Sequence, residues 1–131
     1  MNSLPTHFSA NFQFEAFVAL ATTQLNGQVD FYRAFLAVEP VLLTPTYAEF
    51  RLLGLRLALF MPKPDHRQEF AHSVGSPMSL CLEVADLRDA IARLQSLGYP
   101  PSGDIMHTSH GQEIYAYDPD GNRLILHFMA A

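Results

Sequence analysis

The chain has 131 residues, of which 49% are hydrophobic, so it is long enough to bury the core of one domain over residues 1–131. The net charge of −5, without any Lys/Arg cluster, argues against nucleic acid or an anionic membrane surface as a partner. One cysteine excludes an internal disulfide and a multi-cysteine zinc site, and no apolar run is long enough to cross a bilayer. The first residues do not resemble a signal peptide, so we expect a cytoplasmic protein.

The first half of the chain predicts a strand, a helix and two further strands. Apolar side chains at helical spacing predict a helix over about 27–38, which Pro40 ends. The strands are expected at 14–22, 47–54 and 55–61. The segment 63–77 is rich in proline and mixed charge, which predicts a joint after a first module at about 14–62.

The second half repeats this order of elements. Asp86 is a good N-cap and Gly98 a good terminator, so the sequence between them predicts a helix over about 86–97. The strands are expected at 78–84, 112–117 and 123–128. Strand, helix and strands therefore recur in a second module at about 78–128, although the two halves share little sequence identity.

A tight turn separates the last two predicted strands, in the sequence YAYDPDGNRLILHF at 115–128. Pro119 sets φ for the first corner of the turn, and Gly121 supplies a positive φ. Asp118 and Asn122 can form hydrogen bonds with nearby backbone groups. The pattern predicts a well-defined hairpin at the end of the second module.

The order of the elements resembles that of the vicinal oxygen chelate superfamily, which includes glyoxalase I, extradiol dioxygenases and bleomycin-resistance proteins. The resemblance rests on FVAL…DFYRAFLAVEP, LCLEVADLRDAIARLQSLGY and YDPDGNRLILHF, and it covers roughly residues 14–128. It implies an α+β fold of two βαβββ modules that form a curled, cupped mixed sheet, commonly completed by a second chain. A ferredoxin-like α+β domain is the plainer alternative, but it would leave the wide joint unexplained.

The resemblance also implies where a metal would be held. Metal-dependent members place His, Gln or Glu ligands on strand positions that face the cup, and the matching positions here are Phe17, Ser79 and Ile125. A fourth position falls on the strand 55–61, whose inward side chains are expected to be Arg56, Ala58 and Phe60. None of these side chains is a good ligand for a divalent cation. We therefore expect no metal and no other cofactor.

Alternation along the strands predicts what lines the cup instead. The expected ligand-binding residues are Phe17, Arg56, Phe60, Ser79, Tyr115, Arg123 and Ile125. Rings, aliphatic surface and a few charges suit a small organic molecule held by stacking and hydrogen bonds. His127 and Glu83 are the candidate acid–base catalysts, although a strand-end histidine without a function is the plainer interpretation. Glu83 and Arg56 could form an ion pair or simply be solvated.

Three functions remain open. The favoured one is a metal-free binding protein of the bleomycin-resistance type, in which a homodimer sequesters a small, partly aromatic organic molecule, and the acidic balance of the chain suits a cationic one. The second is a lyase or dioxygenase-type enzyme, which would use unusual metal ligands such as His127 and Glu83 or acid–base chemistry. The third is a degenerate module that acts only by association, with its cup filled by its own side chains.

Overall fold

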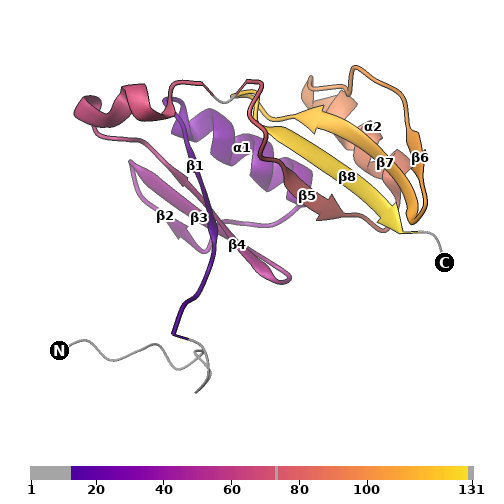
Figure 1. Ribbon diagram of the computed structural model, residues 1–131. Helices are drawn as coiled ribbons and strands as arrows, with labels where there is room; N and C mark the ends of the chain where they lie inside the picture. The colour runs from indigo at the N-terminus through magenta and orange to yellow at the C-terminus, as the bar shows by residue number, and fades with distance from the viewer. Residues whose placement is uncertain (1–12, 73, 130–131) are drawn as a thin grey trace.

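The computed structural model describes residues 13–72 and 74–129 and contains two βαβββ modules in succession (Figure 1). Module one consists of β1 (Val18–Ala21), α1 (Leu25–Leu36), β2 (Leu42–Leu43), β3 (Tyr47–Leu52) and β4 (Leu55–Phe60). Module two consists of β5 (Leu80–Glu83), α2 (Leu87–Leu97), β6 (Met106–Thr108), β7 (Gly111–Tyr117) and β8 (Arg123–Met129). A 3-10 helix, η1 (Pro64–Phe70), lies in the joint. The predicted pair of α+β modules is confirmed.

Each module folds into a four-stranded mixed sheet with the same topology. The strand orders are β1-β4-β3-β2 and β5-β8-β7-β6. In each sheet the first strand pairs in parallel with the last strand of its module, and the other neighbouring strands are antiparallel. The second sheet is therefore a topological repeat of the first. Because the strands form two sheets rather than one continuous sheet, the ferredoxin-like alternative is wrong.

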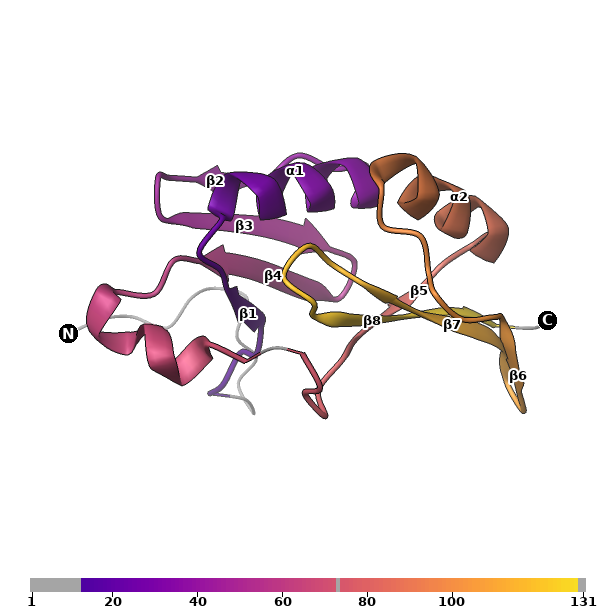
Figure 2. The same cartoon turned by 90° about the horizontal axis from the view of Figure 1, so that it is seen from above.

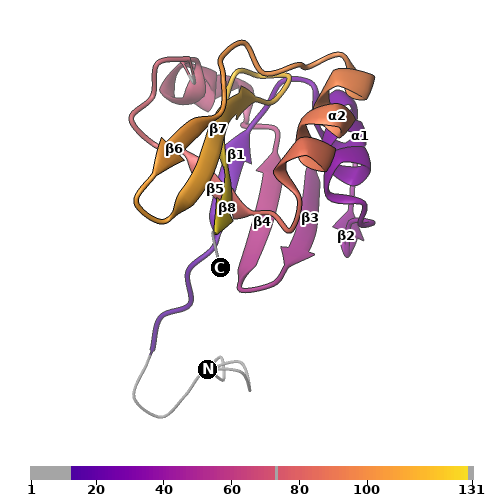
Figure 3. The ribbon, with the colours of Figure 1, turned by 90° about the vertical axis from the view of Figure 1, so that its right-hand side faces the viewer.

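Both helices cover the same side of the two sheets, as Figures 2 and 3 show. The core lies between the helices and this side, and it is continuous across the two modules. Its fully buried side chains include Tyr32, Phe50, Leu57, Leu59, Leu94, Leu124 and Leu126. We call the other side of the sheets the open face, and it carries the side chains that alternate along the strands with these core residues.

The helix ends follow local signals in the sequence. The Asp86 side chain accepts a hydrogen bond from the Asp89 N–H (3.0 Å), and Gly98 ends α2 with a positive φ of 89°. α1 begins and ends two residues earlier than predicted, and it ends at Leu36 because Ala37 adopts a left-handed φ of 56° before Pro40 is reached. Within residues 13–72 and 74–129, no helix is both long and apolar enough to span a bilayer.

The strands differ from the sequence-based prediction mainly at their edges. β1 is shorter than the predicted run at 14–22. β2 and β6, which the resemblance implies but the residue pattern did not locate, have two and three residues and lie at the edges of their sheets. Strands this short carry too few side chains for an alternating pattern, so only their pairing with β3 and β7 defines them.

A buried carboxylate joins the two modules at the turn between β7 and β8. Asp118 is only 3% exposed, and its Oδ1 accepts the backbone N–H groups of Asp120 (3.0 Å) and Asn122 (2.9 Å), as the turn sequence predicts. Its Oδ2 accepts the Asn122 side-chain amide (2.8 Å), the Tyr32 hydroxyl (2.7 Å) and the Gln28 amide (3.1 Å). Tyr32 and Gln28 belong to α1, so the last turn of module two is bonded to the helix of module one.

Further contacts hold α1 against module two. Burial raises the pKa of the Tyr32 hydroxyl well above its usual value, and the negative charge of Asp118 raises it further, so the hydroxyl stays a donor. Gln24 donates from its amide to Asp120 Oδ1 (2.7 Å) at one end of α1. Arg93 of α2 donates to the carbonyl of Phe35 at the other end (3.1 Å). The two helices and the turn therefore form one bonded unit.

Candidate functional site

The open face of module two brings together six of the residues predicted from the sequence. They are Ser79, Glu83, Tyr115, Arg123, Ile125 and His127. Ile125 on β8 lies between Cys81 of β5 and Tyr115 of β7, with the latter 41% exposed. Two residues further along β8, His127 lies between Glu83 and Glu113. The middle of this face is therefore apolar and aromatic, and its far end carries the acid–base groups.

Arg123 lies at the other end of the same strand and is held by neutral oxygen atoms. Its Nε donates to the Ser79 hydroxyl (2.7 Å), and its Nη2 donates to the carbonyl of Ser76 (2.8 Å). These two bonds start from different nitrogen atoms, so they fix the direction of the planar guanidinium. The side chain is partly buried and carries a full positive charge.

His127 and Glu83 are in direct contact, with 2.6 Å between His127 Nδ1 and Glu83 Oε1. The His127 side chain is 16% exposed and the Glu83 side chain 59% exposed. A carboxylate at one ring nitrogen fixes the orientation of an imidazole and leaves the other nitrogen to exchange a proton. This contact has the geometry that acid–base chemistry requires.

The open face of module one holds the remaining predicted residues in a different setting. Arg56 Nη1 lies 3.1 Å from Glu49 Oε1, and Arg56 Nε lies 3.9 Å from Glu15 Oε1. The guanidinium carbon is 4.3 Å from the centre of the Phe17 ring. Arg56 is thus bound within its own module and does not pair with Glu83, the ion-pair partner considered from the sequence.

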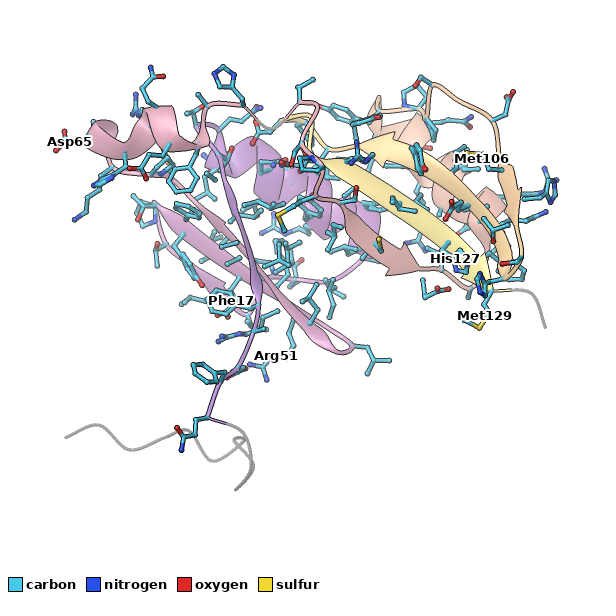
Figure 4. All side chains as sticks on the ribbon, viewed as in Figure 1. Phe17, Arg51, Asp65, Met106, His127 and Met129 are labelled. Carbon is cyan, nitrogen blue, oxygen red and sulfur yellow. The ribbon has the colours of Figure 1, made fainter. Side chains whose placement is uncertain are left out.

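Phe60 and Phe17 are also separated from the residues of module two. The Phe60 ring packs edge-to-face on Phe70 of η1, with 5.3 Å between the ring centres. Figure 4 shows that Phe17 and His127 lie well apart, on different modules. Within one chain, the predicted ligand-binding residues therefore form two groups, one on each module.

The positions implied for a metal do not fit one. Phe17 directly precedes β1 of the other sheet, and Ile125 offers only hydrocarbon. The Ser79 hydroxyl already accepts a bond from Arg123, so a cation beside it would meet a guanidinium. In the part of the chain that the structure describes, no three His, Cys, Asp or Glu side chains are grouped to hold a metal ion.

A cleft of about 580 Å³ between the two modules was not anticipated from the sequence. Its lining includes Phe35, Leu36, Leu52, Leu53, Leu55, Cys81, Leu82, Glu83, Val84 and Arg93. These residues come from the end of α1, the β3–β4 turn, β5 and α2. Since segments far apart in the chain form its walls, no local pattern could reveal it. Cys81 and Glu83, which lie on the open face of module two, also line this cleft.

The comparisons with known proteins agree with this geometry. The family model described as the Glyoxalase/Bleomycin resistance protein/Dioxygenase superfamily matches residues 16–126. No curated protein is similar enough in sequence to count as a match.

Solved structures share the fold over most of the chain. Protein ATC0852 from Agrobacterium tumefaciens is 26% identical, with a TM-score of 0.72 and 88% of this chain and 96% of that chain covered. Lactoylglutathione lyase from the same organism is 22% identical, with a TM-score of 0.68 and coverage of 88% and 93%. The fosfomycin resistance protein FosX from Listeria monocytogenes, in complex with Mn(II) and sulfate, is 16% identical, with a TM-score of 0.71 and coverage of 91% and 92%. Because the family model spans most of the chain, the protein belongs to the Glyoxalase/Bleomycin resistance protein/Dioxygenase superfamily.

Proposed function

We propose that this protein binds a small organic molecule on the open face of module two, without a metal. The observation that carries the proposal is the contact between Arg123 and Ser79, at 2.7 Å, in the position where the resemblance implies a metal ligand. Another position implied for a metal ligand is Ile125, which is apolar and lies beside the half-exposed ring of Tyr115. With coordination replaced by apolar and aromatic surface, desolvation and stacking become the driving force for binding.

We further propose that a second copy of the chain completes the site as a homodimer. The open face of one chain leaves large side chains half exposed on both modules, among them Phe17, Tyr115 and Tyr117. At the sheet edge of module one, Leu42 and Leu43 of β2 are likewise about half exposed. Facing sheets from two chains would cover these rings and enclose a ligand between modules. We expect the dimer in the cytoplasm, where an exposed thiol such as that of Cys81 stays reduced.

An enzyme is the second candidate, favoured by one specific observation. The 2.6 Å contact between His127 and Glu83 is a ready acid–base pair, and it lies at one end of the proposed ligand surface. Two similar structures are named as a lyase and a fosfomycin resistance protein. Glu83→Gln separates the two candidates, because it would abolish turnover of a bound compound while leaving its binding in place.

A thermal-shift screen of small organic compounds tests the binding proposal. A compound that binds only the folded protein raises Tm, by several degrees when its concentration is about a hundredfold above Kd. Ile125→Trp fills the centre of the open face, so it should abolish the shift. Ala92→Trp adds the same side chain to an exposed position on α2 and should leave the shift intact.

Three results would contradict these proposals. A shift that survives Ile125→Trp unchanged would move the ligand elsewhere, with the cleft between the modules as the next place to examine. The absence of any hit, together with a dimer by light scattering, would favour a module that acts only by association. A mass of 14.6 kDa at micromolar concentration, rather than twice that mass, would rule out the homodimer.

A further inference from the structure

The two modules place an arginine at the same position of the open face. Val18 of β1 pairs with Leu57 of β4, and Leu80 of β5 pairs with Leu124 of β8. Because the two sheets have the same strand order, the residues that precede Leu57 and Leu124 are equivalent. These residues are Arg56 and Arg123. The pair provides an internal comparison of two arginines on the same backbone framework.

The charge of Arg56 is offset within its own module. Glu49 lies 3.1 Å away and Glu15 3.9 Å away, and the face of the Phe17 ring adds a cation–π contact at 4.3 Å. Two carboxylates thus surround a single guanidinium. An anionic ligand would have to compete with both of them, so this arginine is not available to one.

The charge of Arg123 is not offset in this way. Its two bonds go to the Ser79 hydroxyl and the Ser76 carbonyl, which are both neutral. Among the described residues, no carboxylate lies within 4.0 Å of its guanidinium. A guanidinium has five N–H donors, and these bonds use two, so donors remain for a ligand. A partly buried cation without a counterion gains stability when an anion pairs with it.

The other charged groups of this face lie at the opposite end of β8. Glu83 and Glu113 both flank His127, and the apolar row of Ile125 and Tyr115 lies between them and Arg123. The acidic end and the cationic end of the face are therefore separated. A ligand that carries an anion on an apolar body fits in only one direction, with its anion at the arginine.

We propose that Arg123 binds the carboxylate of an organic ligand whose apolar or aromatic body lies along Ile125 and Tyr115. This inference rests on the proposed function, since it names the class of molecule that the open face would hold. Ser79 acts as a positioning residue, because its hydroxyl fixes the direction of the guanidinium. The chain carries an overall charge of −5, but Arg123 sets the charge beside the proposed ligand. The overall charge therefore does not determine the class of ligand.

Three probes with the same body and different charges test this inference. Phenylacetate, phenylacetamide and phenethylamine are titrated into the unmodified chain and followed by amide NMR. We expect phenylacetate to bind at least about tenfold more tightly than the other two, with the largest shifts at Arg123, Ser79 and Tyr115. This comparison requires no variant, so it holds even if a substitution disturbs the fold.

Two matched variants sharpen the test. Arg123→Gln should weaken phenylacetate by about tenfold or more and bring it to the level of the amide. Arg88→Gln removes the same charge from an exposed position on α2 and should change the affinity by less than about twofold. Amide spectra of both variants establish that they are folded.

The possible failures are distinguishable. If the amide or the amine binds the same face as tightly as phenylacetate, or if Arg123→Gln retains the affinity for phenylacetate, this inference is overturned while the face remains a binding site. If none of the probes shifts any residue of the open face of module two, and the compound screen also gives no hit there, the proposed function itself fails.

Discussion

The open faces of the two modules share one backbone plan and differ in their chemistry. Where β1 and β4 place Ala21 beside Phe60, β5 and β8 place Glu83 beside His127. Module one therefore has hydrocarbon at the position where module two has an acid–base pair. The equivalent arginines also differ in their neighbours, because Arg56 in module one lies beside two carboxylates and Arg123 in module two, within the described part of the chain, does not. The comparison teaches that the groups able to act on a ligand are concentrated on module two.

The same comparison indicates a structural role for the face of module one. Glu49 and Glu15 offset the charge of Arg56 beside the Phe17 ring, and Phe60 is covered by Phe70 of the joint. Groups that are already paired gain little from a ligand. We therefore expect substitutions on module one to change mainly stability, and substitutions on module two to change mainly binding.

The largest expected effect comes from removing the carboxylate that joins the two modules. Asp118→Ala removes the buried acceptor of Tyr32, Gln28 and the turn, so we expect the free energy of unfolding to fall by about 3 kcal/mol or more. Urea unfolding measures the change. Asp104→Ala, at an exposed position of module two, is the control and should cost less than about 0.5 kcal/mol. An equal cost for the two variants would refute the role given to this carboxylate.

A smaller effect should appear at alkaline pH. The unfolded chain loses the Tyr32 proton near pH 10, whereas the folded chain keeps it because the pKa is raised. The folded state then binds more protons, so the free energy of unfolding falls as pH rises above about 10. Tyr32→Phe should cost about 2 kcal/mol at pH 8 through the lost hydrogen bond, and its stability should fall less steeply above pH 10. Parallel curves for the two proteins would show that another group causes the alkaline loss.

The smallest effect compares the equivalent arginines directly. Arg56→Gln leaves Glu49 and Glu15 together without their cation, and the Glu49 side chain is only 12% exposed. Arg123→Gln instead removes a charge that has no carboxylate partner among the residues that the structure describes. We expect the first substitution to be more destabilising than the second by about 1 kcal/mol in the same unfolding experiment. The reverse order would mean that Arg123, rather than Arg56, is the structural arginine.

Local signals explain what the sequence predicted correctly. The cap at Asp86, the terminator at Gly98 and the turn around Gly121 each act over a few residues, so they can be read directly from the chain. Alternation along β5 and β8 likewise placed Glu83 and His127 on the same face. The order of these elements was sufficient to identify the two modules.

The features of the site that escaped prediction all depend on pairing between separate segments of the chain. The Tyr32 partner of Asp118 is 86 residues away, and nothing near the turn indicates it. The equivalence of Arg56 and Arg123 emerges only from the strand registers, because the two halves share little sequence identity. The pairing of Arg56 with Glu49 arises across β3 and β4, which alternation within a single strand does not predict.

The bond from Tyr32 to Asp118 has a consequence for the order in which the chain can fold. A contact that closes a loop of 86 residues carries a large entropic cost, so it forms late. Until it forms, α1 buries a hydroxyl and an amide that lack their carboxylate acceptor. A fragment that ends in the joint should therefore remain partly unfolded, and adding the separate second half should restore it. The two repeats would then behave as one cooperative folding unit, despite their resemblance to two independent domains.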